Sequence, residues 1–189
     1  MKVTIVGAGA VGASCAEYIA IKDFASEVVI VDIKENFAEG KAMDLMQTAT
    51  LNGFDTKITG STNDYSKTAN TDVAVITSGI PRKPGMTRDD LLQANSKIVH
   101  SVIPSALEQS PDAVVICVTN PLDVMTYLAW KVSGLPTSRI FGMGGVLDSA
   151  RFAYFIAEAT GADIDQIDAL AMGAHGDAMV PMVRHSTVG

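Results

Sequence analysis

The sequence predicts an α/β fold in which a doubly wound parallel sheet is followed by the start of an α+β domain. Short apolar runs rich in β-branched residues alternate with helical patterns over the first part of the chain. A glycine-rich turn, Gly7–Gly12, lies between the first apolar run and the first helical pattern. After about Gly144 the alternation stops, which indicates that a second domain begins there.

The predicted strands and helices of the sheet follow one another in regular order. Strands are expected at residues 2–6, 27–32, 56–60, 72–79 and 113–120, with a short segment at 139–142. Helices are expected at residues 13–22, 38–49, 89–110 and 122–132. Pro104 lies inside the third helix, and we expect it to kink or split that helix because proline cannot donate a backbone hydrogen bond.

The pattern after Gly144 differs from that of the sheet. One helix is expected at residues 147–160, and strand-like pieces are expected at 167–172 and 179–184. We therefore divide the chain into a first domain, residues 1–143, and the N-terminal part of a second domain, residues 144–189, which we expect to be incomplete.

Composition excludes several classes of protein. The formal net charge of −7, without any run of Lys or Arg, argues against nucleic-acid binding, which depends on clustered basic residues. Glycines and Glu17 interrupt the apolar N-terminus, so no signal peptide is predicted, and no stretch is long and apolar enough for a membrane span. Cys15 and Cys117 fall in apolar surroundings typical of buried thiols, which favours a reducing, cytoplasmic location. We predict no metal site.

The glycine-rich turn predicts a dinucleotide site of the Rossmann type. Gly7, Gly9 and Gly12 have the G-x-G-x-x-G spacing, which permits a tight turn, close approach of a pyrophosphate, and packing of helix on strand. Asp32 follows 20 residues after Gly12, at the end of the second strand, where a carboxylate can bind the ribose hydroxyls. It would repel a 2′-phosphate, with only Lys34 nearby to offset it, so NAD is favoured over NADP.

Two arginines lie on the loop that follows the strand ending at Gly79. Pro81, Pro84 and Gly85 exclude a helix there, so Arg82 and Arg88 are expected on an irregular segment at the carboxyl end of the sheet. Guanidinium groups at this edge suit a small substrate with more than one negative group. Taken alone, the pair also fits solvated surface charge.

A second group of polar residues favours acid–base chemistry. Asp148 and Arg151 are three residues apart and so share one part of a helix, a spacing that a plain ion pair also explains. His175 lies between glycines, which leave its imidazole accessible, and a histidine backed by a carboxylate is a tuned proton acceptor. Asn120 ends a strand and directs an amide toward the same crevice.

These motifs together resemble the lactate/malate dehydrogenase family over essentially the whole chain, most closely its malate dehydrogenases of the lactate dehydrogenase-like type. The matching segments are Gly7–Gly12, Asp32, Pro81–Arg88, Val118–Asp123, Leu147–Arg151 and Gly173–Asp177. The resemblance implies a Rossmann domain that binds NAD, followed by a substrate domain.

The resemblance also implies roles for individual residues. His175 would exchange a proton with the substrate hydroxyl, and Asp148 would hold His175. Arg151 would bind the carboxylate beside the reacting carbon, while Arg88, brought in by loop closure, and Asn120 would contact the reacting oxygen. Cofactor contacts are implied for Gly7, Ala8, Gly9, Ala10, Val11, Gly12, Asp32, Asn95, Val118, Thr119 and Asn120.

Arg82 is expected to select the substrate. Lactate dehydrogenases of the family carry a neutral glutamine at the matching position, whereas a guanidinium pairs with the distal carboxylate of a dicarboxylate. We therefore expect NAD-dependent interconversion of (S)-malate and oxaloacetate, as in the tricarboxylic acid cycle, by a homodimer or homotetramer. Lactate dehydrogenase activity remains an alternative, as does a non-catalytic NAD-binding fragment if the chain natively ends at residue 189.

Overall fold

A computed structural model describes all residues from Met1 to Gly189. The chain divides into two compact units, Met1–Phe141 (unit 1) and Gly142–Gly189 (unit 2). Each is described by itself below. None of the helices is long and apolar enough to cross a membrane.

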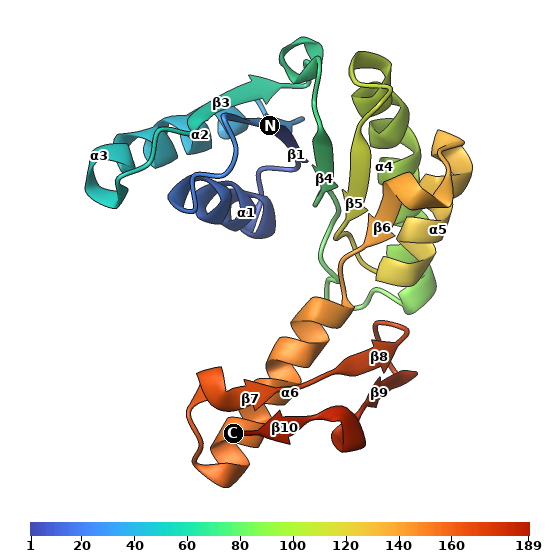
Figure 1. The fold of residues 1–189 in the computed structure, drawn as a ribbon. Helices are drawn as coiled ribbons and strands as arrows, with labels where there is room; N and C mark the ends of the chain where they lie inside the picture. Colours follow the sequence, from blue (N-terminus) through green and yellow to red (C-terminus); the bar gives the residue numbers. More distant parts are fainter. The chain divides into compact units, whose positions relative to one another are not determined.

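Unit 1 is built around a six-stranded sheet with the order β3-β2-β1-β4-β5-β6 (Figure 1). The strands are β1 (Lys2–Val6), β2 (Glu27–Asp32), β3 (Lys57–Thr62), β4 (Val73–Ile76), β5 (Val114–Cys117) and β6 (Ile140–Gly142). β1 pairs in parallel with both β2 and β4, and the order of the strands reverses between β1 and β4. In such a sheet the carboxyl ends of the strands at the reversal form the ligand-binding crevice. The predicted doubly wound α/β fold is confirmed.

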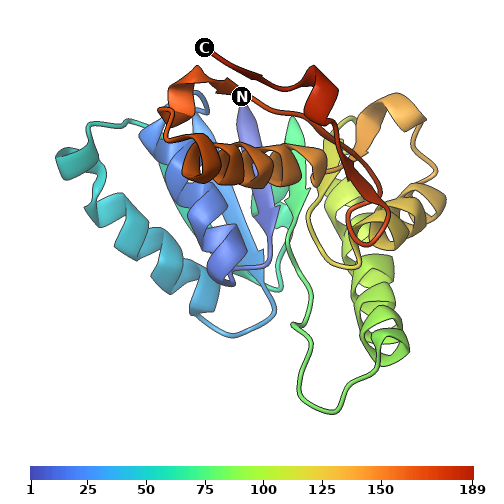
Figure 2. The same cartoon turned by 90° about the horizontal axis from the view of Figure 1, so that it is seen from below.

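Helices cover the sheet of unit 1 and complete two apolar clusters. They are α1 (Ala10–Ile21), α2 (Phe37–Gln47), α3 (Ala49–Asn52), α4 (Arg88–Gln109) and α5 (Leu122–Ser133), with short 3₁₀ turns η1 (Ser66–Thr68) and η2 (Thr137–Arg139). One cluster packs β1 and β2 against α1 and α2, and the other packs β4 and β5 against α4 and α5. α4 and α5 lie side by side in both views (Figures 1 and 2). β1 and β2 each bury four consecutive residues, as expected for central parallel strands.

Unit 2 consists of one helix and two pairs of short strands. The helix is α6 (Gly145–Thr160); the strands are β7 (Ile167–Asp168), β8 (Ala171–Gly173), β9 (Met179–Pro181) and β10 (Thr187–Val188), with 3₁₀ turns η3 (Ile164–Gln166) and η4 (Val183–His185). β7 pairs antiparallel with β10, and β8 pairs antiparallel with β9. The register of β8 and β9, with Gly173 opposite Met179, places residues 174–178 in the connecting loop.

Of the two effects expected of Pro104, a kink or a split, the structure excludes the split, and it corrects the limits of another helix. Pro104 does not split the third predicted helix, because α4 is continuous and its buried residues Val99, Val102, Ile103 and Ala106 anchor it on both sides of the exposed proline. The helix predicted at 38–49 is divided instead at Thr48. Its hydroxyl donates to the Leu45 carbonyl over 2.8 Å, and its N–H bonds the same carbonyl in a tighter turn.

The strand predictions for unit 2 were also too long. Residues 167–172 form two strands rather than one, because β7 and β8 pair with different partners. β9 is the partner of β8, and β10 is the partner of β7. The 3₁₀ turn η4 separates β9 from β10, so they offer no continuous edge with which a single strand could pair. For the same reason the piece predicted at 179–184 forms a strand only from Met179 to Pro181.

Candidate cofactor and catalytic sites

The three glycines of the turn after β1 meet three different steric demands. Gly7 has φ +109°, and a Cβ there would lie 2.8 Å from the backbone nitrogen of Ser78. A Cβ on Gly12 would overlap the Gly7 carbonyl oxygen and lie 2.8 Å from the Thr77 hydroxyl. Nothing lies within 4 Å of a Cβ on Gly9, so this side of the turn is open to an approaching group. Gly7 therefore fits the tight turn, Gly12 fits the close packing of helix on strand, and Gly9 fits the approach of a ligand.

Two features prepare this turn for an anion. The helix α1 starts directly after Gly9, so its first backbone N–H groups point out of the helix end and carry partial positive charge. The Thr77 hydroxyl lies 3.1 Å from the Val6 carbonyl and 3.0 Å from the Gly7 carbonyl, and so supports the turn from β4. The sequence-based prediction had placed the start of α1 at Ala13, one turn too late for this geometry.

Asp32 is tied to the glycine turn. One carboxylate oxygen accepts the Ala8 N–H over 2.7 Å, and the other accepts the Lys34 N–H over 2.9 Å. The carboxylate thus lies at the predicted strand end and beside the turn, where ribose hydroxyls would meet it.

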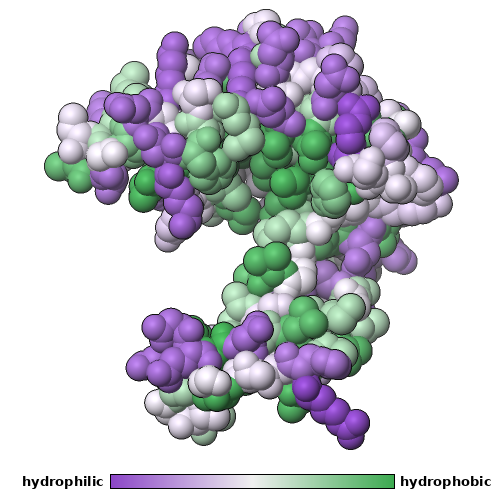
Figure 3. Space-filling view, viewed as in Figure 1, coloured by the Kyte–Doolittle hydropathy of each residue, from purple (hydrophilic) through white to green (hydrophobic).

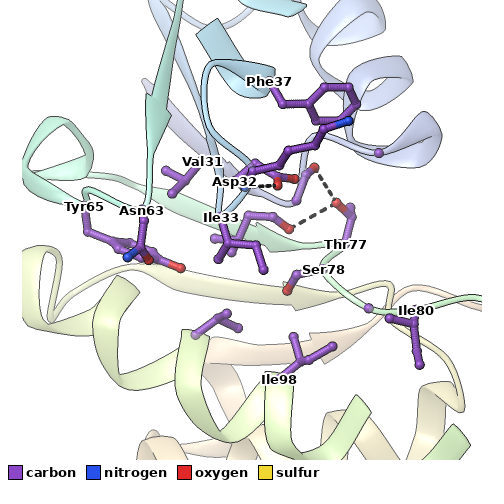
Figure 4. Close-up of a pocket in the computed structure, with 16 residues that line it drawn as sticks. Val31, Asp32, Ile33, Phe37, Asn63, Tyr65, Thr77, Ser78, Ile80 and Ile98 are labelled. Atoms are coloured by element: carbon purple, nitrogen blue, oxygen red, sulfur yellow. Dashed lines mark hydrogen bonds between the residues drawn. The ribbon is translucent and has the colours of Figure 1, made fainter. Parts of the chain in front are cut away.

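A cavity of about 290 Å³ opens beside Asp32 (Figure 4). Its walls come from the ends of β1, β2 and β4 and from α4. Among its apolar lining residues are Ile33, Ile98 and Val102, and among its polar ones are Asp32, Thr77 and Ser78. The Ser78 hydroxyl oxygen is buried and has no hydrogen-bond partner. An apolar cleft with a few polar groups at the switch point of the sheet fits the adenosine end of a dinucleotide.

Charge around the cavity favours a cofactor without a 2′-phosphate. Lys34 is the only lysine or arginine that lines it, and its ammonium lies 4.6 Å from the centre of the Phe37 ring in a cation–π contact. Tyr65 also lines the cavity; burial, and secondly the negative charge of Asp32, raise the pKa of its phenol to about 12. The residues present therefore fit NAD.

The arginine loop leaves β4 and leads into α4. The Nε of Arg82 donates to the Met86 carbonyl over 3.1 Å, which turns the loop back on itself and leaves the two terminal amino groups beyond that bond. Thr87 then caps α4: its hydroxyl accepts the Asp90 N–H over 3.0 Å, and its own N–H bonds the Asp90 carboxylate over 2.9 Å. This cap fixes the position at which Arg88 begins the helix. Both arginines are exposed.

Asn95, Val118, Thr119 and Asn120 lie near the carboxyl ends of β4 and β5. Asn95 is buried in α4, and its amide bonds the backbone of Ile80 and Asn120. The Val118 and Thr119 N–H groups both bond the Ile76 carbonyl, at 2.9 and 3.2 Å, and continue the β4–β5 pairing beyond the strands.

Unit 2 contains the predicted acid–base pair. The His175 Nδ1 lies 2.7 Å from a carboxylate oxygen of Asp148, whose side chain is only 6% exposed. The other Asp148 oxygen lies 3.7 Å from the guanidinium of Arg151, which is 61% exposed. A carboxylate can only accept, so the hydrogen of this bond lies on Nδ1, and in the neutral form of the ring the lone pair is then on Nε2. The helix α6 and the β8–β9 loop thus bring together the three residues predicted for this site.

The predicted site residues therefore fall into two sets, one in each unit. Sequence reasoning missed the supporting roles of Thr77 and the positions of Ser78 and Tyr65 in the cavity. The sequence did offer a signal for Thr77 and Ser78, because both directly follow β4, at the same edge of the sheet as Gly7.

Comparison with known proteins agrees with this arrangement. The profile of the lactate/malate dehydrogenase NAD-binding domain matches residues 1–142, and that of the family's alpha/beta C-terminal domain matches residues 145–189. The chain belongs to the lactate/malate dehydrogenase family. Its residues 1–142 are thus of the NAD-binding type, as the glycine turn and Asp32 predicted.

Curated relatives of this chain carry the name malate dehydrogenase. The protein from Parabacteroides distasonis is 56% identical over 187 residues, which are 98% of this chain and 60% of the relative. The protein from Cytophaga hutchinsonii is 56% identical over 189 residues, or 100% of this chain and 61% of the relative. The chain therefore spans about three fifths of the length of the curated relatives it matches.

The solved structures that resemble this chain include both malate and lactate dehydrogenases. Malate dehydrogenase from Salinibacter ruber has a TM-score of 0.93 and 51% identity, covering 100% of this chain and 59% of that one. A lactate dehydrogenase from Cryptosporidium parvum, solved with lactic acid and nicotinamide adenine dinucleotide, has a TM-score of 0.93 at 40% identity, with coverage of 100% and 59%.

Proposed function

We propose that the protein carrying this chain is an NAD-dependent malate dehydrogenase that interconverts (S)-malate and oxaloacetate. The observation that carries the proposal is the His175–Asp148 pair at 2.7 Å, with Arg151 beside it on α6. Relatives named malate dehydrogenase at 54–57% identity support the proposal. In unit 1 the glycine turn and Asp32 supply the residues that would hold the cofactor.

His175 handles the proton in this proposal. Because Asp148 accepts the Nδ1 hydrogen, the Nε2 lone pair takes the proton of the malate hydroxyl and returns it in the reverse direction. The buried carboxylate also holds the ring in one orientation, so the base is in place before the substrate binds. NAD, when bound, would accept the hydride that leaves the carbon bearing the malate hydroxyl.

Charged and amide side chains hold the substrate in this proposal. Arg151 pairs with the carboxylate next to the reacting carbon, and its exposed guanidinium has the planar geometry for a bidentate contact. Arg88 and Asn120 contact the reacting oxygen. A cation and an N–H donor at this place stabilise the negative charge that develops on the oxygen as the carbonyl is reduced. Arg82 binds the distal carboxylate.

The bond from Arg82 to the Met86 carbonyl supports this last role. It uses Nε, and thereby orients the guanidinium while both terminal amino groups remain for a carboxylate. Pyruvate has a methyl group in place of the distal carboxylate. When the arginine loop closes over the substrate and excludes water, a guanidinium left without its charged partner destabilises the complex by about 2–5 kcal/mol, so the substrate with two carboxylates is preferred.

The proposal is tested by following NADH oxidation with oxaloacetate and with pyruvate. Arg82→Gln should lower kcat/KM for oxaloacetate by roughly 30-fold to several thousand-fold and affect pyruvate far less. Lys83→Gln, which removes the neighbouring charge of the same loop, is the matched control and should change little. Equal losses on both substrates for Arg82→Gln would show that Arg82 does not select the substrate.

Lactate dehydrogenase activity is the second candidate, favoured by the likeness to the Cryptosporidium parvum lactate dehydrogenase at 40% identity. The same assay separates the two, since a lactate dehydrogenase would turn over pyruvate faster than oxaloacetate. A protein that binds NADH but reduces neither substrate would be the non-catalytic alternative.

We also propose that the protein acts in the cytoplasm, in the tricarboxylic acid cycle, as a homodimer or homotetramer. The family resemblance supports the assembly, and two cysteines without a disulfide are consistent with a reducing compartment. Light scattering coupled to gel filtration measures the assembly, and a monomeric mass at micromolar concentration would contradict it.

A further inference from the structure

Ser149 follows Asp148 directly on α6, and its hydroxyl joins that helix to β8. The Ser149 Oγ accepts the Ala171 N–H over 2.9 Å. α6 and β8 lie side by side (Figure 1). α6 carries Asp148, and β8 leads to His175, two positions beyond the end of the strand. The bond therefore connects the two elements that carry the proposed acid–base pair.

The pairing of β8 with β9 leaves the Ala171 N–H on the side away from β9. Ala171 lies opposite Pro181. One position earlier, Leu170 accepts the Met182 N–H over 2.8 Å. In an antiparallel pair, residues alternate between those that bond across the pair and those that do not, so the Ala171 N–H points to the other edge of β8. Pro181, which has no N–H to exchange, agrees with this register.

Ser149 supplies the hydrogen-bond partner that β9 does not. Only 4% of Ala171 is exposed, so its N–H has little access to bulk water. A buried backbone N–H is almost always paired, because leaving it unpaired is unfavourable. Loss of the Ser149 hydroxyl should therefore make β8 shift until the Ala171 N–H meets another acceptor.

A shift of β8 would be passed on to His175. Gly173 ends β8 with φ +94°, and a Cβ there would lie 2.6 Å from the Ala178 carbonyl oxygen. The two sides of the β8–β9 loop are thus in close contact at its base, and the loop moves with the strands that carry it. His175 lies in this loop, and its Nδ1 lies 2.7 Å from the Asp148 carboxylate, a hydrogen bond that tolerates little displacement.

We infer that Ser149 is a positioning residue: by holding β8 against α6, it sets the place of the His175 imidazole relative to Asp148. Asp148 and Ser149 are consecutive on one helix, so the helix fixes the spacing of the two attachments. Asp148 orients the ring, and Ser149 fixes the strand from which the ring is carried. The inference rests on the proposed function, because it assigns the proton transfer to His175.

The test separates proton transfer from the binding of substrate and cofactor. Ser149→Ala is compared with the unmodified protein in its longest form, by steady-state kinetics with oxaloacetate and by NADH titration without substrate. We expect kcat to fall about 10- to 100-fold, as for a displacement of up to about 1 Å of a group that takes part in the reaction. The KM for oxaloacetate and the NADH dissociation constant should each change less than about threefold, because no substrate or cofactor contact is removed. Ser149→Thr keeps a hydroxyl and should restore most of the lost kcat.

Thr160→Val is the matched control for loss of a hydroxyl on the same helix. The Thr160 hydroxyl accepts the Ala162 N–H over 3.3 Å and donates to the Ile156 carbonyl over 2.8 Å, at the opposite end of α6 from Ser149. This variant should lower the melting temperature and leave kcat unchanged. If Ser149→Ala retains its kcat, or weakens NADH binding as much as it lowers kcat, the inference is overturned. A kcat for Ser149→Thr as low as that for Ser149→Ala would also overturn it, because a hydroxyl would then not restore the position.

Two spectroscopic measurements test the link without relying on activity. The proton on Nδ1 of His175 is shared with a carboxylate, so it should give a far-downfield resonance that is absent in His175→Asn. This resonance should shift in Ser149→Ala but not in Thr160→Val. The Ala171 amide should exchange slowly in the unmodified protein, because Ser149 accepts its hydrogen. Rapid exchange there would refute the link even if no variant folds.

The positioning role and the proposed function fail in different ways. If the unmodified protein binds NADH but reduces no oxaloacetate, the proposed function fails, while a resonance shift confined to Ser149→Ala would still support the link. If turnover is normal and the resonance is the same in Ser149→Ala as in the unmodified protein, the positioning role is overturned and the proposed function stands.

Discussion

In unit 1 the strands β1 and β2 each bury four consecutive side chains, whereas in unit 2 only Gly144, Asp148 and Ala171 are buried. Apolar side chains of unit 2 reach its surface among hydrophilic ones, as Figure 3 shows, and Phe155 is 66% exposed. Unit 1 thus rests on a large apolar core, while a charged carboxylate is among the few buried groups of unit 2.

The two units also build their functional groups differently. In unit 1 the residues proposed to hold the cofactor would act largely through backbone geometry, since glycines, a helix end and paired strand ends define the turn. In unit 2 the proposed chemistry depends on side chains, namely an imidazole fixed by a carboxylate. Substitutions in the two units should therefore affect different measurements, and the following predictions separate them.

The largest effect is expected at His175. Its replacement in His175→Asn removes the proton acceptor, so kcat should fall by about 10²–10⁴-fold while NADH binding stays unchanged. His185→Asn, an exposed histidine of unit 2 in η4, is the control and should retain full activity. Kinetics and NADH fluorescence titration measure the two quantities. A large loss of NADH affinity in His175→Asn would contradict the division of roles.

The next effect concerns the two cores. Ile30 is fully buried in β2, so Ile30→Ala should lower the free energy of unfolding by about 2–5 kcal/mol. Phe155→Ala in α6 should change it by no more than about 0.5 kcal/mol, because most of that ring is exposed. Urea unfolding of the 189-residue chain measures both. A cost above about 1 kcal/mol for Phe155→Ala would mean that this face is covered in solution.

A smaller effect on stability is expected at the glycine turn. In Gly12→Ala the new methyl group meets the Gly7 carbonyl and the Thr77 hydroxyl, so the free energy of unfolding should fall by about 1–3 kcal/mol and NADH binding should weaken. Gly40→Ala is a matched substitution in α2, where a Cβ meets nothing within 4 Å, and should stabilise by about 0.5–1 kcal/mol. Equal behaviour of the two variants would show that the turn tolerates a side chain.

The smallest effect is a titration at high pH. Tyr65 has a pKa of about 12 in the folded chain, raised from 10 by burial and by Asp32. Its contribution to stability is complete below pH 10 and is lost as the pH rises toward 12, because the folded state resists ionisation. Tyr65→Phe should therefore lose less stability than the unmodified chain over this interval. Thermal unfolding at pH 9 and at pH 11 measures it, and an identical loss in both proteins would contradict the pKa.

The strands of unit 1 could be predicted from sequence because central parallel strands are uninterrupted apolar runs. Glu27–Asp32 and Lys2–Val6 coincide with the observed strands for this reason. Helix limits were less accurate, since they depend on single bonds. The hydroxyl of Thr48 ends α2, and packing of Val99 and Ile103 keeps α4 intact around Pro104, neither of which hydrophobic periodicity reveals.

Among the site residues, those with a fixed spacing in one motif were the most accessible to prediction. Asp148 and His175 are distant in sequence, and their contact was inferred from chemistry and family resemblance rather than from pattern. Asn95 illustrates the limit: a polar residue within a helix gives no sign of its partners. Its link to Ile80 and Asn120 depends on where two loops meet in space.

The hydrogen bond between Ala8 and Asp32 matters for anyone who wishes to redesign this protein to use the phosphorylated coenzyme. The obvious change is to replace the acidic side chain by a small neutral one, so that repulsion disappears. One oxygen of the Asp32 carboxylate accepts the N–H of Ala8 over 2.7 Å, so the exchange would also release the glycine turn that we propose binds the diphosphate. A redesign should keep an acceptor at this position, as asparagine or serine would provide, and place the new positive charge elsewhere.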